Sequence, residues 1–118
     1  MSQERNNNGI DYIEFSVTDM EEAKSFYGDV FGWTFQDWGP DYASFNDGRI
    51  DGGLRKVESL KSGSPLVIFY SVDLKNIRDK IESTGCPITQ DIFEFPGGKR
   101  FHFNDPFGNE LAVWSEPK

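Results

Sequence analysis

Apolar residues along this chain follow two spacings in turn, one typical of strands and one typical of helices. Residues 11–18 alternate between apolar and polar positions, which predicts a half-buried strand. Asp19 then precedes a helical pattern that runs to Gly32, so a capped helix is expected between these two residues. Its apolar stripe comprises Ala23, Phe26, Tyr27, Val30 and Phe31. Three short strands are expected to follow, near residues 33–38, 41–46 and 51–57.

The second half of the chain repeats this plan. A strand is predicted over 66–72, followed by a helix over 74–84 that begins after Asp73 and ends at Gly85. The apolar stripe of this helix comprises Leu74, Ile77 and Ile81. Three further strands are expected near residues 88–93, 99–104 and 109–115.

Short sequence segments that recur in both halves of the chain support an internal duplication. Residues 13–17 read IEFSV and residues 68–72 read IFYSV, while Phe-Asn-Asp occurs at 45–47 and at 103–105. The halves therefore lie about 55 to 58 residues apart, which indicates a repeated supersecondary unit. We expect one α+β domain of two βαβββ units. Its predicted segments are a disordered N-terminus at 1–9, a first unit at 10–57, a linker at 58–64 and a second unit at 65–116.

Alternation also predicts which side chains point away from the helices. In strand 99–104, Phe101 and Phe103 are expected to face the helix, so Arg100 and His102 face the other way. In strand 66–72, the same argument assigns Ile68 and Tyr70 to the helix side. The second face is therefore polar and aromatic, and its candidate residues are Tyr12, Glu14, Val67, Phe69, Arg100, His102, Glu110, Ala112 and Trp114.

Composition narrows the range of partners. The formal net charge is −8 and no basic stretch occurs, which argues against nucleic acid and favours a cationic ligand. Cys86 is the only cysteine, so no intrachain disulfide forms and a reducing compartment is expected. No signal peptide or membrane-length apolar run occurs, and we expect a cytoplasmic protein without a membrane partner.

Two segments carry a family resemblance: DMEEAKSFYGDVFGW at 19–33 and DPFGNELAVWSE at 105–116. They resemble the vicinal oxygen chelate superfamily of glyoxalases, bleomycin-resistance proteins and dioxygenases, and are most similar to bacterial proteins described as related to lactoylglutathione lyase. The resemblance implies a cup-shaped mixed sheet with helices on its outer face and the site inside the cup. It also implies a homodimer.

The resemblance further implies four metal-ligand positions on the concave face. Here they hold Tyr12, Val67, Ala112 and either Leu54 or Gly53. Aliphatic side chains offer no donor atom to a cation, and tyrosine is a weak ligand unless it is ionised. We therefore expect no metal and no cofactor, and glyoxalase I chemistry is not carried over to this chain.

Three functions remain open at this point. The first is a binding module that holds a small organic molecule in a metal-free aromatic cup, through Tyr12, Phe69, Arg100, Glu110 and Trp114. The second is a metal-independent lyase or isomerase with Glu14 and His102 as an acid–base pair, since imidazole titrates near neutral pH. In a variant of it, Glu14, His102 and Glu110 hold a relocated metal. The third is an interaction domain whose cup is unused.

Overall fold

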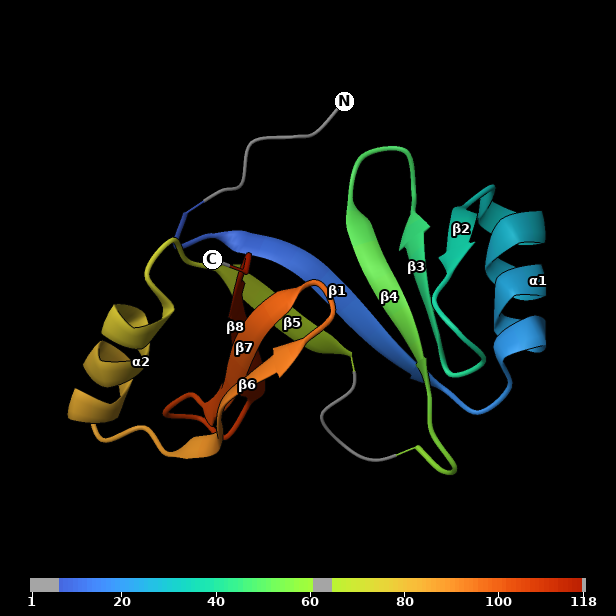
Figure 1. The fold of residues 1–118 in the computed structure, drawn as a ribbon. Coiled ribbons are helices and arrows are strands. Elements are labelled where there is room, and N and C mark those ends of the chain that lie inside the picture. Colours follow the sequence, from blue (N-terminus) through green and yellow to red (C-terminus); the bar gives the residue numbers. More distant parts are fainter. Residues whose placement is uncertain (1–6, 61–64, 118) are drawn as a thin grey trace. The chain divides into compact units, whose positions relative to one another are not determined.

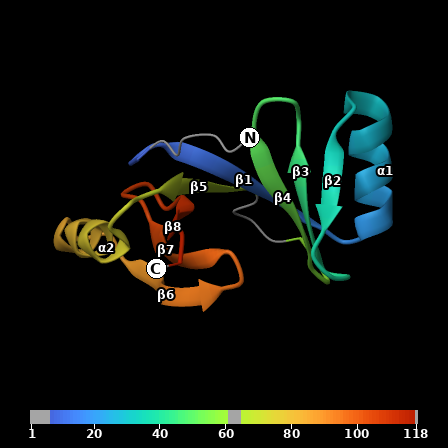
Figure 2. The same cartoon turned by 45° about the horizontal axis from the view of Figure 1, so that its top comes forward.

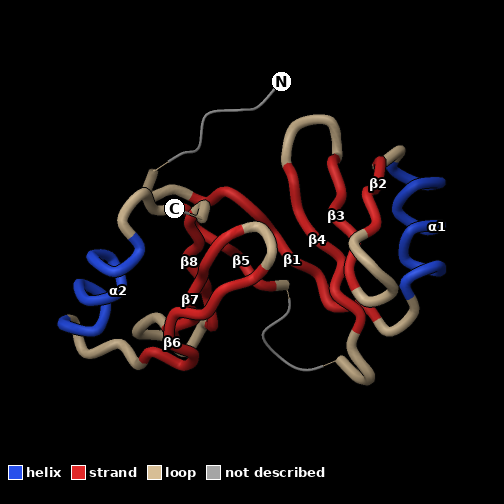
Figure 3. Tube along the Cα trace, viewed as in Figure 1, coloured by secondary structure: helices blue, strands red, loops and turns tan. Residues whose placement is uncertain are grey.

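The computed structural model describes residues 7–60 and 65–117. Its elements follow the predicted order and confirm an α+β protein made of two successive βαβββ units (Figures 1 and 3). They are β1 (Ile10–Val17), α1 (Met20–Phe31), β2 (Thr34–Asp37), β3 (Tyr42–Asn46), β4 (Asp51–Lys56), β5 (Leu66–Tyr70), α2 (Leu74–Ser83), β6 (Ile88–Phe95), β7 (Gly98–Asn104) and β8 (Glu110–Ser115).

The chain divides into two compact units. The N-terminal unit is Tyr12–Leu66, and the C-terminal unit combines the residues up to Asp11 with those from Val67 onward. Strand order is β2-β3-β4-β1 in the first and β5-β8-β7-β6 in the second. In each unit the first and last strands pair in parallel and the other neighbours pair antiparallel (Figure 2).

Both helices begin as the sequence predicts. Asp19 accepts a hydrogen bond from the Glu22 amide at 3.0 Å, and Asp73 accepts one from the Asn76 amide at 3.1 Å. These carboxylates satisfy amide groups that the first helical turn leaves without partners. At the end of α1, Gly32 adopts a left-handed φ of 75°, which glycine reaches without steric cost.

The core of the N-terminal unit lies between α1 and one face of its sheet. Met20 and Ala23 of α1 are buried there, and Trp33 stacks on Phe45 with ring centroids 4.2 Å apart. The predicted stripe on α1 is wider than the surface that the helix buries. Three of its members, Phe26, Val30 and Phe31, are 52%, 59% and 61% exposed. The helix contacts the sheet through a narrower stripe at spacings of three and four, Met20, Ala23 and Tyr27.

The core of the C-terminal unit lies between α2 and its sheet. The predicted stripe of Leu74, Ile77 and Ile81 packs there, as do Phe101, Phe103, Leu111 and Val113. The face predicted for β5 is wrong, because Phe69 also packs into this core. Phe69 pairs with Val113 and Tyr70 with Trp114, and side chains directly opposite in a ladder share a face.

The error on β5 has a simple origin. Matching IEFSV to IFYSV letter by letter offsets the halves by 55 residues and equates Phe15 with Tyr70. The helix caps give the structural offset instead, since Asp19 and Asp73 lie 54 residues apart and equate Phe15 with Phe69. A slip of one residue moves every side chain of a strand to the opposite face.

Residues 7–9 are ordered, contrary to the prediction of a disordered segment over 1–9. The Asn8 amide donates to the Tyr70 carbonyl at 2.7 Å, and the Tyr70 amide donates to the Gly9 carbonyl at 3.0 Å. These bonds join the segment to β5. The rest of the predicted disorder, at 1–6, and most of the predicted linker, at 61–64, lie outside the described residues.

Candidate functional site

A hydroxyl–carboxylate cluster lies on the face of the N-terminal unit that points away from α1. Tyr42 Oη donates to Glu14 Oε2 at 2.9 Å, and the Oη atoms of Tyr12 and Tyr42 lie 2.9 Å apart. Glu14 is only 5% exposed. The structure thus brings together Tyr12 and Glu14, as alternation along β1 predicts, and adds Tyr42.

Gly53 leaves the space that this cluster occupies. A Cβ atom at position 53 would lie 1.8 Å from Tyr42 Oη and 2.8 Å from Tyr12 Oη, so no larger residue fits while both tyrosines keep their positions. Burial, followed by the charge of Glu14 and the neighbouring Tyr12, raises the pKa of Tyr42 far above its usual range. Tyr42 therefore stays protonated and acts as a hydrogen-bond donor to Glu14.

Sequence reasoning missed Tyr42, although a signal for it existed. In the predicted strand 41–46, alternation places Tyr42 on the face opposite Ala43 and Phe45, which are both buried against α1. What the sequence alone could not supply was the register that brings β3 beside β4 and Gly53.

Four of the predicted site residues share the face of the C-terminal unit that points away from α2. Arg100 pairs with Trp114 and His102 with Ala112 across the β7–β8 ladder, as alternation predicts. His102, which is 8% exposed, lies with its Nδ1 3.2 Å from Oε2 of Glu110 on the same face.

Aromatic rings surround these polar groups. The guanidinium carbon of Arg100 lies 5.6 Å from the ring centroid of Phe93 and 5.8 Å from that of Phe95, within the range of cation–π attraction. The His102 ring lies 5.9 Å from Phe93. Sequence reasoning missed both phenylalanines, since the irregular pairing between β6 and β7 obscures which residues of β6 share a face with Arg100.

Trp114 is held in place by hydrogen bonding and packing. Its indole Nε1 donates to Asp11 Oδ2 at 2.9 Å, and its ring lies edge-on to Tyr70 at 5.4 Å. Tyr70 in turn donates a hydrogen bond to Glu116. Asp11 and Tyr70 are further residues of this face that alternation did not assign to it.

Two predictions about the site have different outcomes. Phe69 was expected to line the face opposite the helices, and this is wrong, because it packs beside α2. Glu14 and His102 were expected to form an acid–base pair. The structure shows Glu14 with Tyr42 and His102 with Glu110. Their direct pairing therefore stays a prediction.

The residues at the expected metal positions do not suit a metal ion. The offset of 54 residues makes Leu66, not Val67, the counterpart of Tyr12. Gly53 replaces Leu54 as the relevant position of β4, since Leu54 is fully buried in the core beneath α1. Leu66, Gly53 and Ala112 lack donor atoms in their side chains. Within residues 7–60 and 65–117, no three His, Cys, Asp or Glu side chains gather to hold a metal, which leaves the relocated set of Glu14, His102 and Glu110 without support.

The sequence profile of the Glyoxalase/Bleomycin resistance protein/Dioxygenase superfamily matches residues 9–113. This chain belongs to that superfamily. The match covers both βαβββ units and agrees with the resemblance that the segments at 19–33 and 105–116 carry.

Individual relatives fit the same assignment. A "Glyoxylase-like domain-containing protein" of Didymella fabae is 30% identical over 92% of this chain and 94% of its own length. Methylmalonyl-CoA epimerase from Mycobacterium tuberculosis has a similar structure, with a TM-score of 0.75 at 13% identity over 100% of this chain and 94% of that one. The Mn(II)-bound glyoxalase from Novosphingobium aromaticivorans gives 0.70 at 22% identity, over 92% of this chain and 39% of that one. At these identities the two structures show a shared fold. In the described part of this chain, neither helix is long and apolar enough to cross a membrane.

Proposed function

We propose that this protein binds a small organic molecule without a metal ion, on the face of the C-terminal unit that points away from α2. The observation that carries the proposal is the grouping of Arg100 with two phenylalanine rings, Trp114 and the His102–Glu110 pair. Flat apolar walls with a few polar groups are typical of small-molecule sites.

The local groups define the kind of ligand. Arg100 supplies a planar set of donors that suits a carboxylate or carbonyl group, and the rings beside it suit a planar apolar body. The acidic balance of the whole chain favours a cation, but charges more than about 8 Å away are largely screened at physiological salt. We therefore expect a compact aromatic acid rather than the cationic ligand that the net charge of −8 suggests.

A thermal-shift screen of aromatic acids and matched aromatic amines tests this proposal, since a ligand that binds the native state raises the melting temperature. The expected hit is an acid that shifts the melting temperature of the wild type and of Arg49→Gln, a change at an exposed residue of the other unit. The shift should disappear in Arg100→Gln. Amines that bind both variants equally would contradict the proposal. Treatment with a chelator should leave the melting temperature unchanged.

A second candidate function rests on the Glu14–Tyr42–Tyr12 cluster. A buried carboxylate that is held by a tyrosine hydroxyl is suited to take a proton from a carbon acid, which is the first step of many isomerases and lyases. In this scheme Glu14 accepts the proton as a C–H bond breaks, the electron pair passes into the adjacent carbonyl group of the substrate as an enolate, and Tyr42 positions the carboxylate. Solvent deuterium should then enter a bound ligand in the wild type but not in Glu14→Gln, which still binds it. Equal exchange in both proteins would exclude this role.

The exposed apolar surface of α1 supports a further proposal, that the protein is a homodimer. Phe26, Val30 and Phe31 are each more than half exposed on one helix, and apolar surface of this kind is typical of association sites. Sedimentation should show a dimer for the wild type and a monomer for Phe31→Glu. A monomeric wild type would contradict the proposal.

A further inference from the structure

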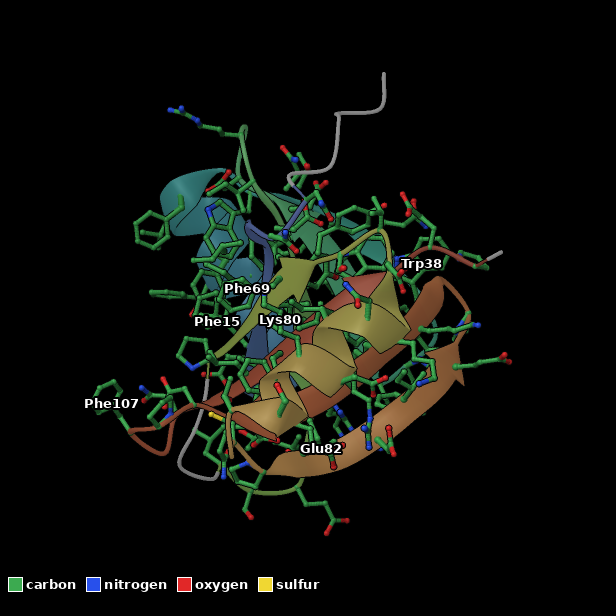
Figure 4. The ribbon with its side chains drawn as sticks, turned by 90° about the vertical axis from the view of Figure 1, so that its left-hand side faces the viewer. Phe15, Trp38, Phe69, Lys80, Glu82 and Phe107 are labelled. Carbon is green, nitrogen blue, oxygen red and sulfur yellow. The ribbon has the colours of Figure 1, made fainter. Side chains whose placement is uncertain are left out.

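An apolar cavity that is open to solvent on one side lies in the C-terminal unit, on the side of its sheet that α2 covers. Its volume is about 160 Å³. Its lining comes from α2, three strands and the N-terminal segment: Asn8, Phe69, Tyr70, Ile77, Ile81, Phe103 and Val113. Figure 4 views this unit from the side of α2 and labels Phe69 beside the helix.

The packing of α2 explains the cavity. The helix packs against β8 and β6, while Phe69 lies on β5 and remains half-buried. The space between Phe69 and the two isoleucines of α2 is therefore incompletely filled. Phe103 and Val113, which are only 8% and 3% exposed, form its floor.

The N-terminal segment borders one end of the cavity. Asn8 lies there with a left-handed φ of 65°, a conformation that few residues other than glycine adopt. Its amide bond to the Tyr70 carbonyl fixes the segment beside β5. The Tyr70 side chain lies on the opposite face of the sheet, beside Trp114. Apart from Asn8, the side chains that line the cavity therefore offer no polar atoms, and a water molecule inside would find few partners.

We propose that this cavity is a second binding site, for a compact apolar molecule or the apolar group of a larger one. The cavity opens to solvent, and its volume is close to that of the enclosed apolar cavities of about 150 Å³ that bind benzene. The site lies on the opposite side of the sheet from Arg100 and His102. Its side chains are therefore distinct from those that carry the function proposed above.

Benzene and 1,4-dioxane are suitable probes because they are similar in size and differ in polarity. The methyl NMR signals of Ile77, Ile81 and Val113 should shift saturably as benzene is added to the intact protein. Dioxane should bind about ten-fold more weakly or worse, since its oxygens would be buried without hydrogen-bond donors. Benzene titrations that leave these methyl signals unchanged would overturn the proposal. So would equal binding of the two probes.

Filling the cavity from either wall supplies a second test. Val113→Phe extends from the sheet and Ile81→Phe from the helix, and each should weaken benzene binding about ten-fold or more. Ile50→Phe makes the same chemical change as Ile81→Phe at an exposed position of the other unit and should leave binding unchanged. If Val113→Phe does not fold, the titrations of Ile81→Phe and of the wild type still show whether benzene binds in the cavity. Benzene binding to Ile81→Phe at wild-type strength would contradict the site.

Discussion

The two βαβββ units share their backbone plan and differ in what they present on their surfaces. An aspartate caps each helix. The phenylalanine four residues before that aspartate, Phe15 or Phe69, packs into the core beneath the helix. Each helix is also tied to a strand by an ion pair at the same spacing. Lys24 bonds Asp37 at 2.9 Å, and Arg78 bonds Asp91 at 2.9 Å, and the partners lie 13 positions apart in both units.

The outer surfaces of the two helices have diverged. On α1, Phe26, Val30 and Phe31 are exposed. In the C-terminal unit, the residues 54 positions later are Lys80, Thr84 and Gly85, so the apolar patch is not repeated there. Surface positions contribute little to folding, so they are free to specialise while caps and core positions are kept.

The faces that point away from the helices have diverged further. In the N-terminal unit, a buried carboxylate accepts a hydrogen bond from Tyr42, whose hydroxyl also bonds that of Tyr12, over a glycine. In the C-terminal unit, the same face carries a guanidinium and an imidazole among aromatic rings. The two units thus differ on these faces, since the first carries a buried acidic group beside tyrosine hydroxyls and the second carries basic side chains among aromatic rings.

Core truncation gives the largest expected effect and tests whether both units are essential to stability. Phe101→Ala in the C-terminal unit and Phe45→Ala in the N-terminal unit should each lower the free energy of unfolding by about 3–5 kcal/mol, because each leaves a cavity. Phe101 is fully buried and Phe45 is 5% exposed. Chemical denaturation measures both losses.

Phe107→Ala is the matched control for this prediction. Phe107 is 88% exposed at the turn between β7 and β8, where Figure 4 shows it pointing outward. Its removal should change the free energy of unfolding by less than about 0.5 kcal/mol. If Phe45→Ala also cost so little, the aromatic core of the N-terminal unit would not contribute to stability as the structure indicates.

The sequence predicted the features that local chemistry decides. Asp19, Asp73 and Gly32 define helix ends through short-range hydrogen bonds and backbone freedom, and each is found as predicted. Alternation along β1, β7 and β8 also assigned Glu14, His102 and Trp114 to the correct faces. In these strands one face is apolar and the other is not, so the period of two is visible in the sequence.

The sequence failed where the period is hidden or where contacts are non-local. Strand β5 reads LVIFY, which is apolar on both faces, so only its pairing with β8 reveals that Phe69 faces α2. Tyr42 was missed because its bond to Glu14 depends on the placement of β3 beside β4. The bulged pairing of β6 likewise hid Phe93 and Phe95 beside Arg100.

Tyrosine-to-phenylalanine changes give an intermediate effect. They test whether a tyrosine bonded to a buried carboxylate in the N-terminal unit contributes more stability than one bonded to an exposed carboxylate in the C-terminal unit. Tyr42→Phe removes a donor from the buried carboxylate of Glu14 and should lower the free energy of unfolding by about 1–3 kcal/mol. Tyr70→Phe removes a donor from Glu116, which is exposed and regains water, so its cost should be below about 1 kcal/mol. Equal losses of unfolding free energy in the two variants would contradict an effect of the burial of Glu14 compared with the exposed Glu116.

The pH dependence of Tyr42→Phe sharpens this test. Burial and the charge of Glu14 raise the pKa of Tyr42 in the folded protein, whereas in the unfolded chain the hydroxyl titrates near 10. Its contribution to stability is therefore complete below about pH 10 and is lost as the pH rises further. Thermal melts of the wild type should decline above that pH, and the decline should be smaller in Tyr42→Phe.

The helix–strand ion pairs give the smallest expected effect and test whether the repeated contact behaves alike in both units. Arg78 holds the pKa of Asp91 below its ordinary value, so this pair stabilises the protein above about pH 4 and loses its effect as the pH falls. Asp37 holds the pKa of Lys24 above its ordinary value of 10.5, so that contribution is lost only as the pH rises beyond that value. Arg78→Gln should therefore make the melting temperature less sensitive to pH below 4, with a smaller effect at high salt. Lys24→Gln should reduce the sensitivity above about pH 10. If neither variant changed the pH dependence of the melting temperature in its own pH range, the two ion pairs would be repeated in the fold without contributing to its stability.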